Sequence, residues 1–294
     1  MKDIPRFLEE MLLKQYGEDI AKQIISGYQK QRYVTLRVNT IKSSVKEIEN
    51  VLIKNNIEFE HISWNENALI IKNVREDRIK EMDIFRDGKI YLQSLSSMIP
   101  AVILEPKAQE NILDMAAAPG GKTTQIAAIT NNQCMITACE KNKIRADRLK
   151  YNLEKQGVRC TNVMLEDARK LSDFFSFDKI LLDAPCSGSG TEGIFNKSFS
   201  KDLIDRSSKV QTELLIKALK ILKPGNEMVY STCSILRQEN EDILNSVLHK
   251  ISAEIVPINI DVNIPKLDTT INGTLCVAPN ELYEGFFVAK IKKK

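Results

Sequence analysis

The sequence predicts an α/β fold: an open, mostly parallel sheet with helices on both faces, preceded by a small α+β unit. From Asn111 onward, apolar segments alternate with amphipathic helical segments, which is typical of parallel strands joined by crossover helices. A glycine-bearing loop, residues 116–121, follows the first of these segments. Before residue 106 the apolar spacing is helical first and alternating afterwards. We therefore expect two domains, residues 1–105 and 106–294.

The first domain combines a helical start with a compact β-α-β-β unit. Residues 1–30 place apolar side chains at helical intervals, for example Ile20 and Ile24. The alternation and the capping serines that follow predict a strand, a helix and two strands: residues 33–39, 43–52, 59–62 and 68–71. Pro100 and Pro106 bracket the passage into the second domain.

The second domain contains the alternating elements. The predicted strands are residues 112–115, 135–139, 161–165, 179–183 and 227–231. The predicted helices begin near Lys122, Asn142, Asp167 and Lys201, and Pro224-Gly225 ends the last of them. Residues 285–291 form a final strand, which we expect to pair antiparallel at the sheet edge.

The composition excludes several kinds of protein. A net charge of +3 on 294 residues permits a polyanionic partner without requiring one. The six cysteines form no C-x-x-C pair and only two histidines occur, so we expect no metal site. No segment approaches the ~18 apolar residues of a membrane span, and the first ten residues lack an apolar signal core. We expect a cytoplasmic, soluble protein with reduced thiols and no membrane association.

The loop at residues 116–121 is a candidate nucleotide site because it joins a strand to a helix N-terminus, where backbone N–H groups are free. It consists of Ala116, Ala117, Ala118, Pro119, Gly120 and Gly121, and Lys122-Thr123 follow. The ending resembles a P-loop, but that motif requires glycine at position 116. The G-x-G-x-x-G pattern of dinucleotide folds is absent. A third interpretation is an S-adenosyl-methionine site, where the glycines let the ligand approach the backbone.

Three polar residues are further cofactor candidates. Glu140 ends the second strand, where an acid can accept hydrogen bonds from both ribose hydroxyls. Asp167 follows the third strand and either faces an adenine or caps a helix. Arg145 lies on the helix after Glu140, and its alternative is an ordinary solvated position.

Two of the cysteines have an unusual context. Cys186 follows Asp183-Ala184-Pro185, and Cys233 lies within Ser231-Thr232-Cys233-Ser234. Each follows a strand, and the carboxyl ends of strands in an open parallel sheet face one crevice. We therefore expect both thiols to meet the cofactor loop there. A thiolate that adds to carbon-6 of cytosine makes carbon-5 able to accept a methyl group, and the Asp183 carboxyl group can promote the addition at N3.

These motifs together resemble the RNA (cytosine-5)-methyltransferase family of the Sun/RsmB type. The resemblance is carried by residues 114–123, 183–190 and 230–234, and it extends to Arg37-Val38-Asn39-Thr40, Gln93, Ser97 and residues 285–289. It implies a class I S-adenosyl-methionine-dependent methyltransferase, Rossmann-like, with a small α+β RNA-binding domain in front.

The resemblance also implies residue roles. Residues 116–122 hold the methionine end of the cofactor, Glu140 the ribose and Asp167 the adenine side. Asp183 lies between cofactor and base, and Lys122 contacts the base or orients Asp183. Cys233 is the nucleophile, and Cys186 assists product release.

The expected partner is RNA, with tRNA favoured over rRNA because the chain is compact, and we expect a monomer. Residues 33–105 would form the RNA platform. Two alternatives of other classes are a P-loop NTPase or kinase acting on a small molecule, and an RNA-binding scaffold without activity.

Overall fold

The computed structural model describes residues 4–260 and 263–294, and the chain forms two compact units. The thiol unit, named for Cys186 and Cys233, comprises Met1–Arg32, Leu171–Ser176 and Leu182–Lys294. The loop unit, named for the loop at residues 116–121, comprises Tyr33–Lys170 and Phe177–Leu181.

The loop unit begins with a small antiparallel sheet of order β2-β3-β1-β4. Its strands are β1 (Val34–Val38), β2 (Phe59–His61), β3 (Ala68–Ile71) and β4 (Ile90–Leu92). Leu36 of β1 lies opposite Leu69 on one side and Leu92 on the other. The predicted β-α-β-β unit is confirmed, and β4 is an additional strand that the periodicity did not indicate.

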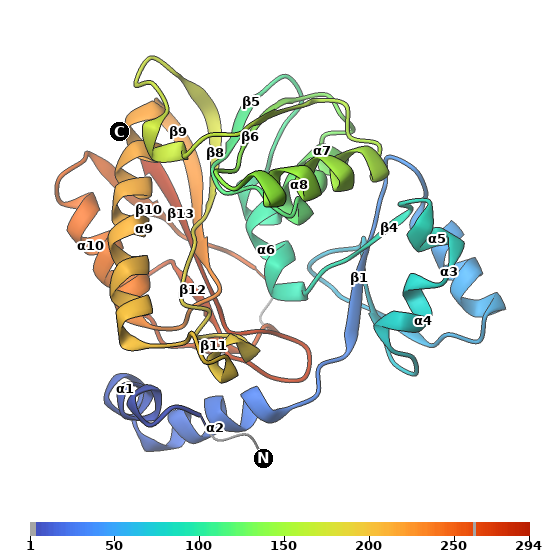
Figure 1. Cartoon of the computed structure of the whole chain (residues 1–294), viewed down its shortest axis with the longest axis horizontal. Helices are drawn as coiled ribbons and strands as arrows, with labels where there is room; N and C mark the ends of the chain where they lie inside the picture. The colour runs from blue at the N-terminus through green and yellow to red at the C-terminus, as the bar shows by residue number, and fades with distance from the viewer. Residues whose placement is uncertain (1–3, 261–262) are drawn as a thin grey trace. The chain divides into compact units, whose positions relative to one another are not determined.

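Three helices contribute apolar side chains to the core of this sheet (Figure 1): α3 (Val45–Lys54), α4 (Glu76–Lys80) and α5 (Asp83–Arg86). Ser44 caps α3, since its hydroxyl accepts a hydrogen bond from the Glu47 backbone N–H at 3.3 Å. The next helix is α6 (Leu95–Leu104), which is almost wholly buried. Pro100 lies inside α6, and Pro106 follows that helix before β5 begins at Asn111.

The second part of the loop unit is a parallel sheet of order β8-β5-β6-β7. Its strands are β5 (Asn111–Asp114), β6 (Met135–Cys139), β7 (Thr161–Met164) and β8 (Phe177–Asp183), whose last two residues belong to the thiol unit. Leu113 of β5 pairs with Thr137 of β6 and with Ile180 of β8. The predicted parallel strands are confirmed.

The helices α7 (Gly121–Ile129) and α8 (Lys143–Lys155) begin within one residue of their predicted starts. The helix predicted near Asp167 is wrong, because only a 3-10 turn, Ala168–Lys170, forms there. The carboxylate of Asp167 accepts a hydrogen bond from the Arg169 backbone N–H at 3.1 Å. Such a local turn competes with helix formation.

The thiol unit has a sheet with antiparallel pairing between β11 (Lys266–Leu267), β12 (Leu275–Val277), β13 (Phe286–Lys293) and β9 (Leu222–Thr232), in that order. A further strand, β10 (Ala253–Val256), also pairs with β13. The closing strand thus pairs antiparallel with β9, as predicted. Its predicted place at the sheet edge is wrong, because β12 and β11 extend the sheet beyond it. Helix α9 (Lys201–Ile221) packs along β9, and α10 (Glu241–Leu248) packs on α9 (Figure 1).

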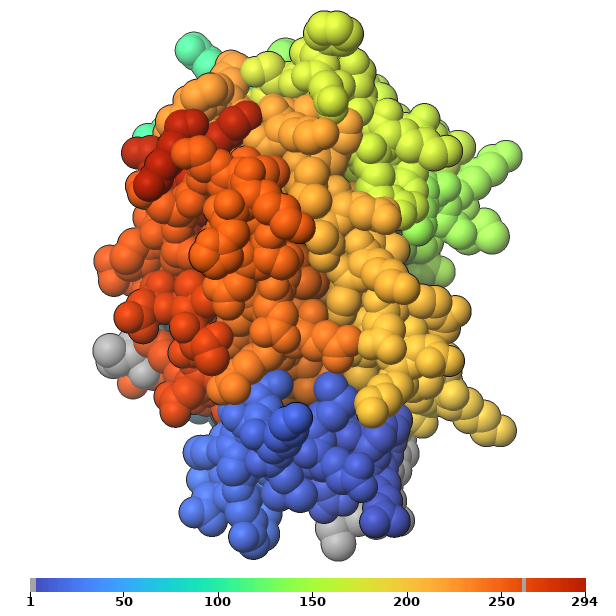
Figure 2. Space-filling view, turned by 90° about the vertical axis from the view of Figure 1, so that its left-hand side faces the viewer, coloured from blue at the N-terminus to red at the C-terminus, as the bar shows by residue number. Residues whose placement is uncertain are grey.

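The helical start consists of α1 (Arg6–Tyr16) and α2 (Glu18–Gln29), which pack within the thiol unit. Figure 2 shows these blue helices against the gold and orange segments of that unit. The rings of Phe7 and Phe199 stack with centroids 5.5 Å apart. At Gly27 a side chain would be impossible without movement, since a Cβ atom would lie 1.9 Å from the Pro279 carbonyl oxygen. Across residues 4–260 and 263–294, none of the helices has the length and apolar character needed to span a membrane.

Candidate active site

The loop at residues 116–121 is held against the end of the neighbouring strand. The Ala117 backbone N–H donates to the Cys139 carbonyl at 2.9 Å, which fixes the loop beside β6. The first α-helical bond of α7 runs from the Thr124 N–H to the Gly120 carbonyl at 2.8 Å. The N–H groups before Thr124 have no acceptor within the helix and point toward the space beyond its N-terminus.

The two glycines of this loop lie against other parts of the protein. Gly120 has φ +108°, and a Cβ atom there would lie 3.0 Å from Leu149 Cδ1. A Cβ atom at Gly121 would lie 3.4 Å from Tyr91 Cε1. Sequence reasoning attributed both glycines to close approach by a ligand. The structure adds that Gly120 leaves room for α8, whereas a Cβ atom at Gly121 would make only an ordinary contact with Tyr91 of β4.

Two side chains of α8 hold the carbonyl groups of the loop. Arg145 Nη2 donates to the Ala118 carbonyl at 2.8 Å, and Asn152 Nδ2 donates to the Pro119 carbonyl at 2.7 Å. Arg145 had been a cofactor candidate, and Asn152 was missed. Their spacing of seven residues, which places both on one helix face, is the signal that identifies Asn152.

Glu140 provides a buried carboxylate directly after β6, with 3% of its surface exposed. Its backbone N–H donates to the Met164 carbonyl at 3.1 Å. Its Oε1 accepts from the Asn142 N–H at 2.9 Å, and its Oε2 lies 3.5 Å from Arg145 Nε. A buried carboxylate with these few partners suits vicinal hydroxyl groups, which need acceptors.

Asp167 is engaged locally. Arg169 Nη2 donates to Asp167 Oδ2 at 2.6 Å, and Arg169 Nε donates to Oδ1 at 3.0 Å. The side-chain hydrogen bond from Arg169 is the main cause that lowers the pKa of Asp167 to about 2. The structure therefore shows the capping contact that the sequence had left as one of two alternatives.

The first turn of α7 is also fixed by hydrogen bonds. Lys122 Nζ donates to Ser97 Oγ at 2.9 Å. The buried Thr123 hydroxyl donates to Asp114 Oδ2 at 2.7 Å, which ties α7 to the end of β5. These contacts hold the loop and the helix N-terminus in one conformation.

In the thiol unit, the sulfur atoms of Cys186 and Cys233 lie 2.9 Å apart. The hydrogen bond with Cys233 and, after it, burial raise the pKa of the Cys186 thiol well above its ordinary value. Either sulfur can donate in this pair, and the raised pKa of Cys186 favours its thiol as the donor to the Cys233 sulfur. The sequence predicted two accessible loop thiols, and the structure makes them a hydrogen-bonded pair.

Asp183 lies at the end of β8, close to the same strand end that carries Cys233. Its Oδ1 accepts a hydrogen bond from the Ser231 hydroxyl at 2.7 Å. The Ala184 N–H donates to the Ser231 carbonyl at 2.8 Å. Two contacts to one residue fix the start of the Pro185-Cys186 turn.

Glu239, which sequence reasoning missed, fixes the other end of this turn. It is fully buried, and its carboxylate accepts from the Ser187 N–H at 2.7 Å and from the Ser187 hydroxyl at 2.5 Å. Gln211 Nε2 donates to the Pro185 carbonyl at 2.9 Å and to Glu239 Oε1 at 3.3 Å. Glu239 is therefore a positioning residue for the loop of Cys186.

The N-terminal helices anchor both thiol loops. The Tyr28 hydroxyl donates to the Ser189 carbonyl at 2.5 Å, three residues after Cys186. Gln15 Nε2 and the Tyr16 hydroxyl both donate to the Ile235 carbonyl, at 2.8 and 2.6 Å, two residues after Cys233. Helices α1 and α2 thus contribute directly to the geometry of the thiol pair.

No group of three or more histidine, cysteine, aspartate or glutamate side chains in the described part of the chain has the arrangement of a metal site.

Comparison with known proteins agrees with this arrangement of loops. A family model described as 16S rRNA methyltransferase RsmB/F matches residues 101–292, which is more than half of the chain. A second model, the ferredoxin-like domain of RsmF/B-like methyltransferases, matches residues 4–76. The chain belongs to the RsmB/F family.

Among similar members of this family, the tRNA (cytosine(49)-C(5))-methyltransferase of Pyrococcus abyssi is 32% identical over 97% of this chain and 96% of its own length. The ribosomal RNA small subunit methyltransferase F of Shewanella piezotolerans is 36% identical over 92% of this chain, which spans 60% of that enzyme. The crystal structure of NSun6 from Pyrococcus horikoshii with SFG has a TM-score of 0.90 and 25% identity, and 99% of each chain is covered.

Family membership identifies this protein as an S-adenosyl-methionine-dependent RNA (cytosine-5)-methyltransferase. The predicted fold class, enzyme class and cofactor are confirmed. The alternatives of a P-loop NTPase and of an inactive RNA-binding scaffold are wrong. The residues of the loop unit fit the cofactor, because they offer the N-terminus of α7 and the buried Glu140 carboxylate to an adenosyl-methionine group.

Proposed function

We propose that this enzyme methylates carbon-5 of cytosine in tRNA. The proposal rests on the share of each relative's length that this chain matches. The chain covers 96% of the archaeal tRNA enzyme but 60% of the Shewanella rRNA enzyme. The competing candidate is the same reaction on rRNA, favoured by the slightly higher identity of 36%.

We assign the cofactor to the loop unit. Residues 116–121 and the N-terminus of α7 hold the methionine end, Glu140 accepts from the ribose hydroxyls, and Asp167 borders the adenine. Arg145 acts indirectly, since it holds the Ala118 carbonyl and pairs with Glu140. When bound, S-adenosyl-methionine supplies the methyl group.

We assign the attack on cytosine to Cys233. Its sulfur forms a bond to carbon-6, and the electron pair displaced from the 5,6 double bond makes carbon-5 nucleophilic. Cys186 supports this assignment, because a thiol that keeps its proton donates to the Cys233 sulfur and stabilises negative charge there.

Asp183 and Lys122 assist the addition in this scheme. Asp183, oriented by Ser231, interacts with the N3 side of the base, and Lys122 contacts the base or orients Asp183. After methyl transfer, a base takes the proton from carbon-5, and the electron pair of that C–H bond re-forms the 5,6 double bond. The carbon–sulfur bond breaks at the same time, and Cys233 leaves as a thiolate. Cys186 assists this release.

We also propose that residues 1–105 serve as the RNA-binding domain and residues 106–294 as the catalytic domain, within a monomer. In this division α1 and α2 belong to the first domain by sequence, while their hydrogen bonds anchor loops of the second.

The decisive experiment measures transfer of labelled methyl groups to unmodified tRNA, to 16S rRNA and to small ribosomal subunits. The proposal predicts methylation of tRNA, with cytosine 49 as the first position to examine. Preferential methylation of either ribosomal substrate would contradict it. Bisulfite sequencing of RNA from a deletion strain and its parent then identifies the position in the cell.

Cysteine variants test the assigned chemistry. Cys233→Ala should abolish transfer, whereas Cys186→Ala should still attack and accumulate a covalent RNA–protein adduct on a denaturing gel. Cys160→Ala removes a half-buried thiol of the loop unit and should behave like the wild type. If Cys233→Ala methylates RNA at the wild-type rate, the assignment of the nucleophile is wrong.

A further inference from the structure

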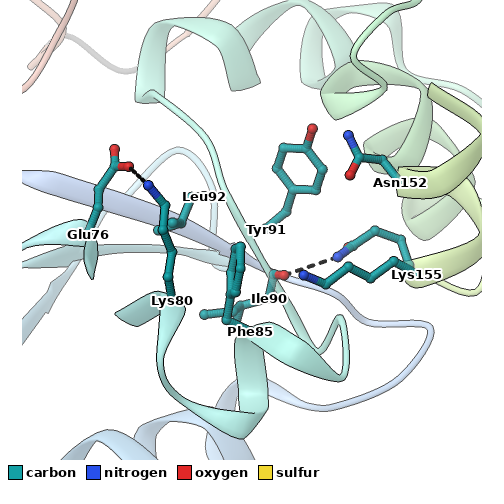
Figure 3. Close-up of a pocket in the computed structure, with 9 residues that line it drawn as sticks. Glu76, Lys80, Phe85, Ile90, Tyr91, Leu92, Asn152 and Lys155 are labelled. Carbon is teal, nitrogen blue, oxygen red and sulfur yellow. Dashed lines mark hydrogen bonds and ion pairs between the residues drawn. The ribbon is translucent and has the colours of Figure 1, made fainter. Parts of the chain in front are cut away.

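A cavity of about 290 Å³ lies in the loop unit beside the small sheet. Figure 3 shows the side chains that surround it, contributed by α4, α5, β4 and the C-terminal end of α8. They are Glu76, Lys80, Phe85, Ile90, Tyr91, Leu92, Asn152, Lys155 and Gln156. Ligand pockets begin at roughly 300 Å³, so this cavity has room for one ligand of modest size.

The walls of the cavity combine aromatic and aliphatic side chains with polar ones. The rings of Phe85 and Tyr91 are half-buried, and Figure 3 shows both beside the pocket, with the Asn152 amide near the Tyr91 hydroxyl. Gln156 Nε2 donates to the Ile90 carbonyl at 3.1 Å, which secures α8 to β4. Aromatic rings with an adjacent amide provide stacking and an edge for hydrogen bonding.

The charge in the cavity is positive. Lys80 forms an ion pair of 2.7 Å with Glu76. Lys155 lies with its Nζ 3.8 Å from the centroid of the Phe85 ring, and no carboxylate other than that of Glu76 lines the pocket. Burial and then the charge of Lys42 lower the pKa of Lys155. An anionic group near Lys155 would relieve both effects.

The cavity shares its walls with the cofactor loop. Tyr91 is the side chain that a Cβ atom at Gly121 would meet, at 3.4 Å. Asn152 donates to the Pro119 carbonyl at 2.7 Å. A ligand that contacts Tyr91 and Asn152 therefore touches two side chains that lie against opposite ends of the turn at residues 119–121.

We propose that this cavity binds one unstacked nucleotide of the RNA substrate, with its base against Phe85 and Tyr91 and a phosphate group beside Lys155. The proposal rests on the enzyme's action on RNA. Proteins read single-stranded RNA by stacking splayed bases on aromatic rings and by hydrogen bonds to base edges. The nucleotide is one other than the target, because the target cytosine itself must reach a thiol.

Affinity measurements with an unmodified tRNA transcript test the pocket. Lys155→Gln and Phe85→Leu should each raise the Kd for RNA about tenfold, within the range found for loss of one stacked base. Lys150→Gln, on the exposed side of the same helix and outside the pocket, should raise it about twofold or less, the scale of a surface charge. The kcat at saturating RNA should also change little in Lys150→Gln.

Photocrosslinking provides a readout that does not depend on stability. A transcript with 4-thiouridine should crosslink to the peptide that contains Phe85 or Tyr91, and Lys155→Gln should reduce that crosslink. The inference is overturned if wild-type enzyme methylates the transcript but neither peptide crosslinks and both pocket variants bind RNA like the wild type. Failure of the wild type to methylate any RNA would instead contradict the proposed function.

Discussion

Within the thiol pair, Cys233 affects the pKa of Cys186. The hydrogen bond with Cys233 is the first cause of the raised pKa of Cys186, and burial is the second. Cys233→Ala removes the first cause, so the pKa of Cys186 should fall toward its ordinary value. At a pH below the pKa, each unit of decrease raises the thiolate fraction about tenfold.

We therefore expect iodoacetamide to modify Cys186 faster at pH 8 in Cys233→Ala than in the wild type, because a lower pKa leaves a larger fraction of the thiol ionised. Peptide mass spectrometry measures the rate, with the buried Cys139 as an internal reference. Cys233→Ser keeps a hydrogen-bonding group and should show a smaller increase. Equal rates of Cys186 modification in all three proteins would contradict the coupling.

Glu239 places a carboxylate where two donors of Ser187 converge. Glu239→Gln puts an amide there, whose NH2 group faces one of these donors, and leaving a buried donor unsatisfied costs about 1–3 kcal/mol. We expect a covalent RNA adduct to accumulate, because the displaced Cys186 loop releases product slowly. Gel analysis measures the adduct, while S-adenosyl-methionine affinity should not change.

A suitable control for Glu239 is Gln238→Ala. Gln238 is adjacent in sequence, but its amide contacts the exposed Asp205 at 2.6 Å. If Glu239→Gln and Gln238→Ala have the same low level of adduct, Glu239 has no role in positioning Cys186.

At the scale of elements, α2 depends on a close backbone approach. Alanine normally stabilises a helix interior by about 1 kcal/mol relative to glycine. At Gly27, however, the added methyl group would lie 1.9 Å from the Pro279 carbonyl oxygen, and forced overpacking costs typically 1–3 kcal/mol or more. Gly27→Ala should therefore lower the free energy of unfolding by at least about 1 kcal/mol.

Urea unfolding measures this change, and Ser26→Ala is the matched control. Ser26 is the preceding residue of α2 and is exposed, so its substitution should be neutral or slightly stabilising. An increase in stability for Gly27→Ala would mean that α2 and the Pro279 loop separate at little cost. Because α2 carries Tyr28, the variant should also lower the rate of methyl transfer.

The elements differ in how far the sequence alone predicts them. Strands β5 and β6 are evident because buried parallel strands form continuous apolar runs. Strand β4 is only three residues long, which is too short for a periodic pattern. The predicted helix after Asp167 failed because Arg169 pairs with that aspartate, and this contact is not apparent from helical spacing.

The residues of the candidate site also differ in how far the sequence alone predicts them. The loop at residues 116–121 and the two cysteines stand out because their residue types are unusual after a strand. Glu239 and Ser187 are 52 residues apart, and Tyr28 and Ser189 are 161 apart. Only the folded chain brings such partners together. In the sequence, a polar residue that becomes buried, such as Glu239, cannot be told apart from the polar residues around it.

At the scale of the whole molecule, a net charge of +3 on 294 residues gives little long-range attraction for RNA. Affinity then depends on local contacts between lysine or arginine side chains and phosphates, each of which releases counterions. For three or four such contacts, RNA affinity should fall about 20- to 150-fold between 50 and 200 mM salt. Fluorescence anisotropy with a labelled tRNA transcript measures the Kd at each salt concentration. Lys155→Gln should lower the slope of log Kd against log salt by ~0.7–0.9, which is the contribution of one phosphate contact. A slope near zero in the wild type would show that stacking rather than charge dominates binding. An unchanged slope in Lys155→Gln would mean that no phosphate lies beside this lysine, even if Phe85 and Tyr91 stack on a base.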